Sequence, residues 1–217
     1  MLNWNIKFEL KKFLDGLEKK KILDFGCGDA RYKEIISRKN SYTGVDVKVS
    51  GHPENKKNYD ILWDKNKLPF SDESFDVVVC TEVLEHVEEL NITIQELRRV
   101  LKKGGLMFIT MPFIWAEHEK PYDFRRFTSF GIKKVFTDYG FNIISHKKLV
   151  KGKNAFKQIF YSETNRNFSK YYKNNFIKLF IKIYFFFLKT IFRIFVKLLP
   201  ENTFAEIFIN NCLIVKK

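Results

Sequence analysis

The sequence predicts an α/β fold in which seven strands form one sheet and helices cover both of its faces. Two observations carry this prediction. Short apolar runs alternate along the chain with segments of helical periodicity, the pattern of a mostly parallel sheet. A strand also ends in a glycine turn in residues 21–32, "KILDFGCGDARY". A third feature, a basic and Phe-rich stretch near the C-terminus, predicts an amphipathic helical insertion between the last two strands.

The elements follow one another in a regular order. The expected strands are residues 21–25, 42–47, 59–63, 77–81, 106–112, 141–150 and 212–215. The expected helices are residues 5–19, a helix that opens at Asp29 and runs to about Arg38, residues 91–105 ended by Gly104 and Gly105, and residues 128–139 with Thr128 as the N-cap. Residues 48–58 are polar and contain Gly51 and Pro53, so only a stub of a helix is expected there.

Composition limits the class of protein. The chain has 217 residues, 45% of them hydrophobic, enough for a sizeable core in one domain plus an elaboration. Cys27, Cys80 and Cys212 are scattered in apolar runs, a pattern of neither a disulfide framework nor a zinc motif. They favour a reducing compartment. No charged region followed by a long apolar core opens the sequence, so we expect no secretory signal.

The positive charge is unevenly distributed. Residues 1–146 hold 24 Lys/Arg and 22 Asp/Glu, a net charge of +2, whereas residues 147–217 hold 15 and 3, a net charge of +12. This division predicts a near-neutral catalytic domain whose basic tail docks on an anionic surface.

The sequence of the glycine turn distinguishes between two nucleotide-binding motifs. A dinucleotide fold uses G-x-G-x-x-G, but Arg31 occupies the sixth place here. The stretch instead resembles motif I of class I S-adenosylmethionine (SAM) methyltransferases, with Ala30 in place of the third glycine. The resemblance implies a Rossmann-like sheet with an antiparallel last strand. It also implies cofactor contacts at the turn, made by Asp24, Gly26, Cys27 and Gly28, with Asp24 near the amino-acid end of SAM.

Further cofactor residues are expected after the next strands. Asp46 ends the second strand, where a carboxylate can accept both hydroxyls of a ribose, although this spacing is shared by nucleotide and SAM folds. The run from Asp64 through "LPF" to Asp76 resembles type 11 methyltransferases. That resemblance implies that Asp64 bonds the adenine amino group, and it adds Leu68 and Glu82 to the expected cofactor contacts.

Two histidines are candidates for a general base. His86 follows Glu85 in "EVLEHV", where the pair either acts in catalysis or merely begins a helix and orients a loop. The segment with His118, Pro121, Asp123, Arg126 and Thr128 resembles methyltransferases of bacterial surface-polysaccharide gene clusters. His118 is accordingly the first candidate base and His86 the second, and Asp123 and Arg126 are expected to pair and hold the loop. No metal cluster is predicted, because the acidic and histidine residues of 117–123 are few and close together in sequence.

The Phe-rich stretch of residues 176–199 is long enough to suggest a membrane span. Its five cations, Lys178, Lys182, Lys189, Arg193 and Lys197, fall within an arc of roughly 100° on a helix. A central charge costs about 2.5 kcal/mol or more in a bilayer, so spanning is disfavoured. A basic stripe beside an apolar face is typical of a helix in the membrane interface. The alternative is a helix whose apolar face packs on the domain or on a second subunit.

These features together predict a SAM-dependent methyltransferase. The expected domain comprises residues 1–149 and 209–217, with residues 150–208 as the basic, membrane-interfacial insertion. The main expectation is O-methylation of a sugar on a membrane-associated glycan or lipid-linked intermediate, by a cytoplasmic protein peripheral to the inner face of the cell membrane. Alternatives are a lipid or quinone methyltransferase, a nucleic-acid methyltransferase, which the Phe-rich setting of the charge disfavours, and a non-catalytic, membrane-docked protein.

Overall fold

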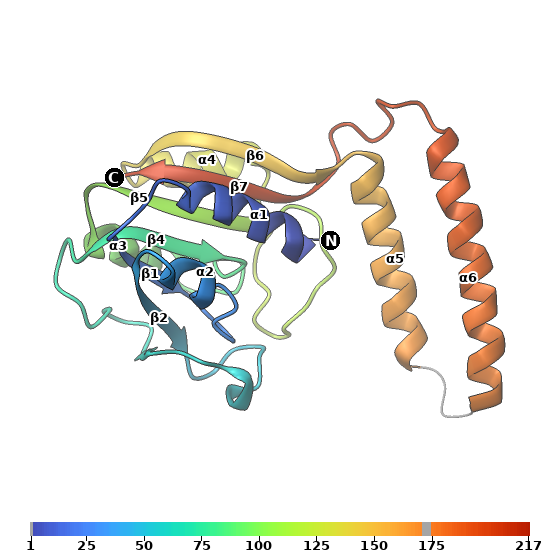
Figure 1. Ribbon diagram of the computed structural model, residues 1–217, viewed down its shortest axis with the longest axis horizontal. Helices are drawn as coiled ribbons and strands as arrows, with labels where there is room; N and C mark the ends of the chain where they lie inside the picture. Colours follow the sequence, from blue (N-terminus) through green and yellow to red (C-terminus); the bar gives the residue numbers. More distant parts are fainter. Residues whose placement is uncertain (1, 171–174) are drawn as a thin grey trace. The chain divides into compact units, whose positions relative to one another are not determined.

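The computed structural model describes residues 2–170 and 175–217, and a seven-stranded sheet forms its framework (Figure 1). The strand order is β3-β2-β1-β4-β5-β7-β6. The first five strands run parallel to their neighbours, and β7 is antiparallel to β5. The strands are β1 (Lys21–Phe25), β2 (Ser41–Val47), β3 (Ile61–Trp63), β4 (Phe75–Thr81), β5 (Leu101–Pro112), β6 (Asn142–Lys151) and β7 (Phe208–Lys216). The predicted fold class is confirmed.

Helices cover both faces of the sheet. α1 (Leu2–Leu14) and α2 (Lys33–Ser37) pack on one face, and α3 (Leu90–Val100) and α4 (Ser129–Asp138) pack on the other. β4 shows why both faces are buried: Val77 and Val79 join the α1/α2 core, whereas Val78 and Cys80 join the α3/α4 core. Side chains alternate along a strand, so a continuous apolar run supplies both layers. The helical stub expected in residues 48–58 is a short 3₁₀ helix, Glu54–Lys56.

Three helices have boundaries that differ from the sequence prediction. α1 covers Leu2–Leu14 rather than residues 5–19, and Gly16, with a left-handed φ of 83°, lies in the turn after it. α2 begins at Lys33 rather than Asp29, because Gly28 and Ala30 both adopt a φ of 56° and keep the chain out of the helical region. The glycine turn is therefore followed by further turns and not directly by a helix. α3 ends at Val100 rather than at the glycines, because Leu101 is buried and pairs with Phe75 in the sheet. Gly104 and Gly105 lie within β5, where the register with β4 shifts.

Residues 150–209 form a compact unit separate from residues 2–149 and 210–217. This unit contains two helices, α5 (Lys153–Lys170) and α6 (Asn175–Leu198), rather than the single helix predicted. They pack through aromatic side chains: the Phe160 and Phe192 rings stack with centroids 3.7 Å apart, and Phe156 lies 5.3 Å from Phe192. No helix in the described part of the chain combines the length and apolarity needed to cross a membrane.

Candidate functional site

The expected site residues gather at one edge of the sheet. β1, β2, β4 and β5 run parallel, so their carboxyl ends meet at the same edge. The glycine turn follows β1, and Asp46 is the second-last residue of β2. The segment from Glu82 to His86 follows β4, and the loop with His118 follows β5. In open α/β sheets this edge is the ligand-binding side.

The glycine turn is closely packed on one side and open on the other. A Cβ added to Gly26 would lie 2.3 Å from Val83 of the segment after β4, so a side chain cannot be accommodated there. Gly28 also has a left-handed φ of 56°, but nothing lies within 4 Å of the position its Cβ would take. The Cys27 side chain is buried, and burial raises the pKa of its thiol to about 12. The turn therefore presents bare backbone at Gly28, as a ligand-contacting turn requires.

Asp46 joins the ends of β1 and β2. Its Oδ2 accepts a hydrogen bond from the Gly28 amide at 2.7 Å, and its Oδ1 accepts one from the Val47 amide at 2.7 Å. The buried Lys57 ammonium lies 3.4 Å from Oδ1. A carboxylate offers about four acceptor positions, so two remain after the amide bonds, besides the contact with Lys57. The structure places Asp46 beside the glycine turn, where the sequence predicted a ribose acceptor.

Asp24 is buried beneath the turn. Only 1% of its surface is exposed, and the Tyr42 hydroxyl donates to its Oδ2 at 3.0 Å. Burial raises the pKa of this carboxyl to about 7, although the bond from Tyr42 opposes the shift. Its bond to Tyr42 ties the end of β1 to β2.

Asp64 and Leu68 differ in exposure. Asp64 is exposed just after β3, and its Oδ1 accepts from the Asn66 amide at 3.0 Å. Leu68 lies in the core; its amide donates to Glu96 at 2.8 Å and its carbonyl accepts from Arg99 at 3.0 Å. Both backbone groups of Leu68 are thus bonded to α3, and the structure gives this residue a packing role.

Glu82 begins the segment after β4. Its carboxylate accepts from the Thr110 hydroxyl of β5 at 2.7 Å and from the Asn210 amide of β7. Burial raises the pKa of Glu82, and the bonds from Thr110 and Asn210 oppose the rise. Residue 82 has a φ of 55°, and residues 82–87 form turns, so the helix start expected for Glu85 and His86 is absent from this segment.

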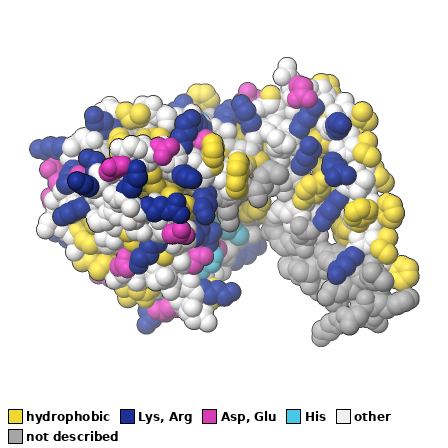
Figure 2. Space-filling model, in the orientation of Figure 1, with side chains coloured by type: hydrophobic (Ala, Val, Ile, Leu, Met, Phe, Trp, Pro, Cys, Tyr) yellow, Lys and Arg dark blue, Asp and Glu magenta, His cyan; other side chains and the backbone are white. Residues whose placement is uncertain are grey.

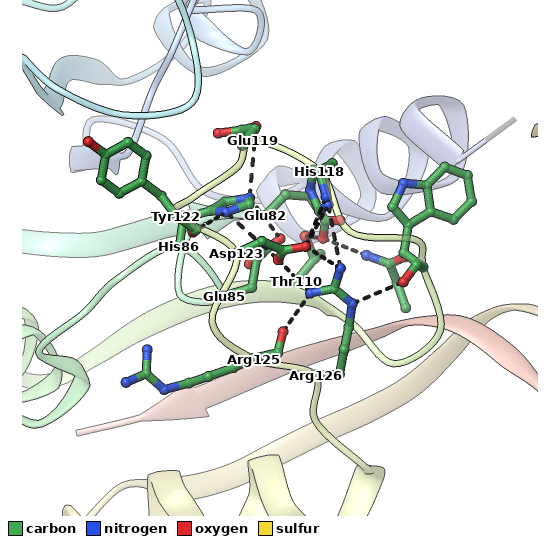
Figure 3. Close-up of polar contacts among 12 residues, drawn as sticks. Glu82, Glu85, His86, Thr110, His118, Glu119, Tyr122, Asp123, Arg125 and Arg126 are labelled. Atoms are coloured by element: carbon green, nitrogen blue, oxygen red, sulfur yellow. Dashed lines mark hydrogen bonds and ion pairs between the residues drawn. The ribbon is translucent and has the colours of Figure 1, made fainter. Parts of the chain in front are cut away.

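Glu85, His86 and His118 form a cluster that the sequence analysis did not assemble (Figure 3). The Glu85 carboxylate is fully buried, and neither of its oxygens has a hydrogen-bond partner. His86 Nε2 is likewise buried without such a partner, 3.8 Å from Glu85 Oε1. The His86 and His118 rings meet edge to face with centroids 4.8 Å apart. One candidate ligand atom from each residue lies within 4.8 Å of the other two, so these three residues could hold a metal ion.

Asp123 and Arg126 hold the loop that carries His118, as predicted. Arg126 Nη1 and Nη2 bond the two Asp123 oxygens at 2.6 and 2.7 Å, a bidentate pair (Figure 3). Asp123 also accepts from the His118 amide at 3.0 Å, and its Oδ2 lies 3.3 Å from His118 Nδ1. Burial alone would raise the pKa of Asp123, but the Arg126 and His118 bonds outweigh it and lower the pKa to about 2.

Burial controls the protonation of the cluster. It raises the pKa of Glu85 well above its usual value, and the nearby Glu82 charge adds to the rise. Burial also lowers the pKa of His118, although Asp123 opposes the shift. His118 is therefore uncharged near neutral pH, the form that can accept a proton. Sequence reasoning considered the Glu85–His86 pair but did not bring it together with His118, because local pattern does not show which way a turn residue faces.

Comparison with known proteins shows which proteins this chain resembles. Residues 23–109 match the family model described as a methyltransferase domain. The mitochondrial ubiquinone biosynthesis O-methyltransferase of Mus musculus is 38% identical over 106 residues, which cover 42% of this chain and 28% of that protein. The enzyme of the same name from Hydrogenovibrio crunogenus is 29% identical over 48% of each chain. The matches span about half or less of these relatives.

The solved structures agree on the fold. The SAM-dependent methyltransferase of Archaeoglobus fulgidus superposes on 98% of this chain with a TM-score of 0.59, at 16% identity and 93% coverage of its own length. Residues 23–109 thus match a methyltransferase domain, and the chain shares the fold of SAM-dependent methyltransferases. The residues of the domain fit SAM, since Gly28 leaves open the space that a Cβ would take and Asp46 retains acceptor capacity beside it.

Proposed function

We propose that this chain is an O-methyltransferase whose acceptor is a hydroxyl on a membrane-associated molecule. The observation that carries the proposal is the meeting of His86 and His118, with ring centroids 4.8 Å apart, at the sheet edge that also carries the glycine turn and Asp46. SAM, when bound, supplies an electrophilic methyl group. Asp46 and the turn would orient the cofactor, and His118, or His86 beside it, would take the acceptor proton.

Two acceptor classes have separate support. The matched relatives are named for ubiquinone biosynthesis, which favours a phenolic hydroxyl on a lipid-anchored quinone precursor. The loop of residues 118–128 resembles methyltransferases of surface-polysaccharide clusters and favours a sugar hydroxyl, with His118, Asp123 and Arg126 in the matching places. The family match covers residues 23–109, and the loop follows it. We rank the phenolic lipid first because named enzymes support it.

The compact unit of residues 150–209, called the basic unit below, supports the proposal of a membrane-associated acceptor. α6 divides into three faces at about 100° per residue. Phe192 and the buried Val196 mark the face toward α5, and Lys182, Arg193 and Lys197 occupy a neighbouring face. The third face stays exposed and apolar, with Phe180, Ile183, Tyr184, Phe187, Ile191, Ile194, Phe195 and Leu198 each at least 45% exposed. Figure 2 shows hydrophobic and Lys/Arg side chains gathered along this helix. We propose that these two faces lie in an anionic membrane interface, on the cytoplasmic side.

The test measures S-adenosylhomocysteine formed by the purified chain. The acceptors are a polyprenylated dihydroxybenzoate, a lipid-linked oligosaccharide and an RNA control. We expect turnover with the phenolic lipid and none with RNA, and His118→Ala should lower turnover about 10²–10⁴-fold while SAM still binds. Turnover with the oligosaccharide alone would transfer the assignment to the sugar. SAM binding without turnover on either lipid-linked acceptor would support the non-catalytic alternative.

A further inference from the structure

The cluster of Glu85, His86 and His118 contains polar groups that the fold leaves without protein partners. Both Glu85 oxygens and His86 Nε2 are buried and make no hydrogen bond. An unpartnered carboxyl group is unfavourable in the interior, where it takes either a proton or a ligand, so this group is available to a ligand that the protein itself does not supply. Because the residues come from two separate loops, the fold and not local sequence brings them together.

The two histidines are oriented as metal ligands usually are. His86 Nδ1 lies 2.8 Å from the Tyr122 carbonyl oxygen. His118 Nδ1 lies 3.3 Å from both the Ala116 carbonyl oxygen and Asp123 Oδ2, closer than the 3.5 Å that separates it from Arg126 Nη2. An oxygen acceptor at Nδ1 favours the tautomer with its proton there, which leaves the Nε2 lone pair free to coordinate. Asp123 is in turn fixed by the bidentate bond from Arg126. Both rings therefore have the supporting contacts of a metal site.

Spacing and charge also suit a cation. Ligand atoms around one ion of zinc size lie about 3–4 Å apart, since each bond is about 2.0–2.2 Å long. Glu85 Oε1 and His86 Nε2 are 3.8 Å apart, and the three candidate ligand atoms lie within 4.8 Å of one another. Glu119 Oε1 lies 3.8 Å from His86 Nε2 and 2.7 Å from His52 Nε2. Arg126 is paired with Asp123, so its charge is already offset.

We propose that Glu85, His86 and His118 bind one divalent transition-metal ion. Two imidazole nitrogens and one carboxylate favour Zn²⁺, Fe²⁺ or Mn²⁺ over Mg²⁺ or Ca²⁺, and this ligand set leaves coordination positions open. The inference deepens the proposed function, on which its role rests: an acceptor oxygen would take an open position. In that state both histidines would serve as ligands rather than as the base, the ion would lower the pKa of the bound acceptor hydroxyl, and the released proton would pass to solvent water.

The experiment uses the untagged full chain, stripped with chelator and titrated with Co²⁺ and Zn²⁺. We expect one ion per chain, visible Co²⁺ absorption bands that Zn²⁺ abolishes, and a calorimetric binding isotherm. His118→Asn, His86→Asn and Glu85→Gln should each weaken binding by more than about 100-fold. Asp123→Asn, which removes the partner of a ligand, should weaken it about 10–100-fold. The matched control is His146→Asn on β6, whose ring bonds Asn211 outside the cluster.

His118 provides the decisive variant, because its side chain is 31% exposed on a loop and its replacement should leave the fold intact. Equal Co²⁺ spectra and affinities for wild type and a folded His118→Asn variant would overturn the metal site. Full methyl transfer by chelator-stripped protein would remove its catalytic role. Calorimetry with SAM distinguishes failure of the metal site from failure of the proposed function. A chain that binds Co²⁺ but not SAM would contradict the methyltransferase proposal and leave the metal site intact.

Discussion

Asp46 carries the contacts that fix the cofactor side of the site. Its carboxylate accepts from the Gly28 and Val47 amides and lies 3.4 Å from Lys57. If it also accepts the ribose hydroxyls, Asp46→Ala should weaken SAM binding by about 1.5–3 kcal/mol, the range for hydrogen bonds to charged groups. Calorimetry measures the change, with Asp46→Asn as a milder variant and Asp138→Asn on α4 as the surface control. Unchanged affinity in a folded Asp46→Ala protein would show that the ribose assignment is wrong.

Asp24 should give the fold a pH dependence of opposite sign to that of an ordinary paired carboxylate. Burial raises its pKa from 3.8 to about 7. Between these values the folded chain keeps a proton that the unfolded chain has released, so the free energy of unfolding falls as the pH rises. The contribution is fully present below about pH 4 and is lost by about pH 7. Its size is at most about 4 kcal/mol.

Asp24→Asn tests this dependence, because an amide keeps an acceptor for Tyr42 and does not titrate. Urea unfolding at several pH values gives the free energy of unfolding for both proteins. We expect the difference between variant and wild type to grow in favour of the variant from pH 4 to 7 and then to level off. Glu82 and Glu85 titrate in both proteins and cancel in this difference. Parallel profiles would contradict the buried-carboxyl explanation.

At the scale of elements, the N-cap of α4 stabilises the helix that follows the His118 loop. Thr128 Oγ1 accepts from the Gly131 amide at 3.0 Å. Thr128→Ala should lower the free energy of unfolding by about 1 kcal/mol, because an amide of the first turn loses its partner. The matched control is Thr137→Ala in the same helix, where the hydroxyl bonds carbonyls of its own helix and alanine has the higher propensity. An equal fall in the free energy of unfolding in both variants would show that the Thr128 cap does not stabilise α4.

The elements were largely predictable because apolar strands and helical periodicity are local properties. All seven strands and the Thr128 cap follow from such patterns. The start of α2 was not predictable, since Ala30 gives no sign of its left-handed φ of 56°. The early start of β5 depends on the pairing of Leu101 with Phe75, a contact between distant residues. α5 was missed because its polar and apolar residues lack a clear helical stripe.

The site was predictable on the cofactor side and less so on the acceptor side. The sequence identifies Asp46 and the glycine turn because each lies at the end of a predicted strand. In the structure they meet, since the Gly28 amide donates to Asp46. The meeting of His86 with His118 depends on how two loops fold over the sheet edge, which spacing does not determine. The buried, unpartnered state of Glu85 is likewise a property of tertiary packing.

At the scale of the whole molecule, the smaller unit is the more densely basic: residues 150–209 carry a net charge of +8, and the other 157 residues carry +6. The basic unit places Lys182, Arg193 and Lys197 beside an exposed apolar face of α6. Lys178 of the predicted stripe lies outside the residues whose side chains the structure describes. Each Lys or Arg near an anionic surface contributes about 1 kcal/mol, and apolar burial adds to it. Membrane binding should therefore need both the charges and the aromatic side chains.

Liposome sedimentation tests this docking. The wild type should sediment with anionic vesicles, bind neutral vesicles weakly and be released in part by high salt, because salt screens exposed charges. Changing Lys182, Lys189 and Arg193 to Glu should abolish sedimentation. Changing Phe187 and Ile191 to Ser on the apolar face should weaken it even at low salt. SAM affinity should stay unchanged in both variants, since their substitutions lie in α6. Binding that ignores lipid charge, or a dimer that buries this face in solution, would contradict the interfacial helix and leave the acceptor assignment resting on the relatives and the His118 loop.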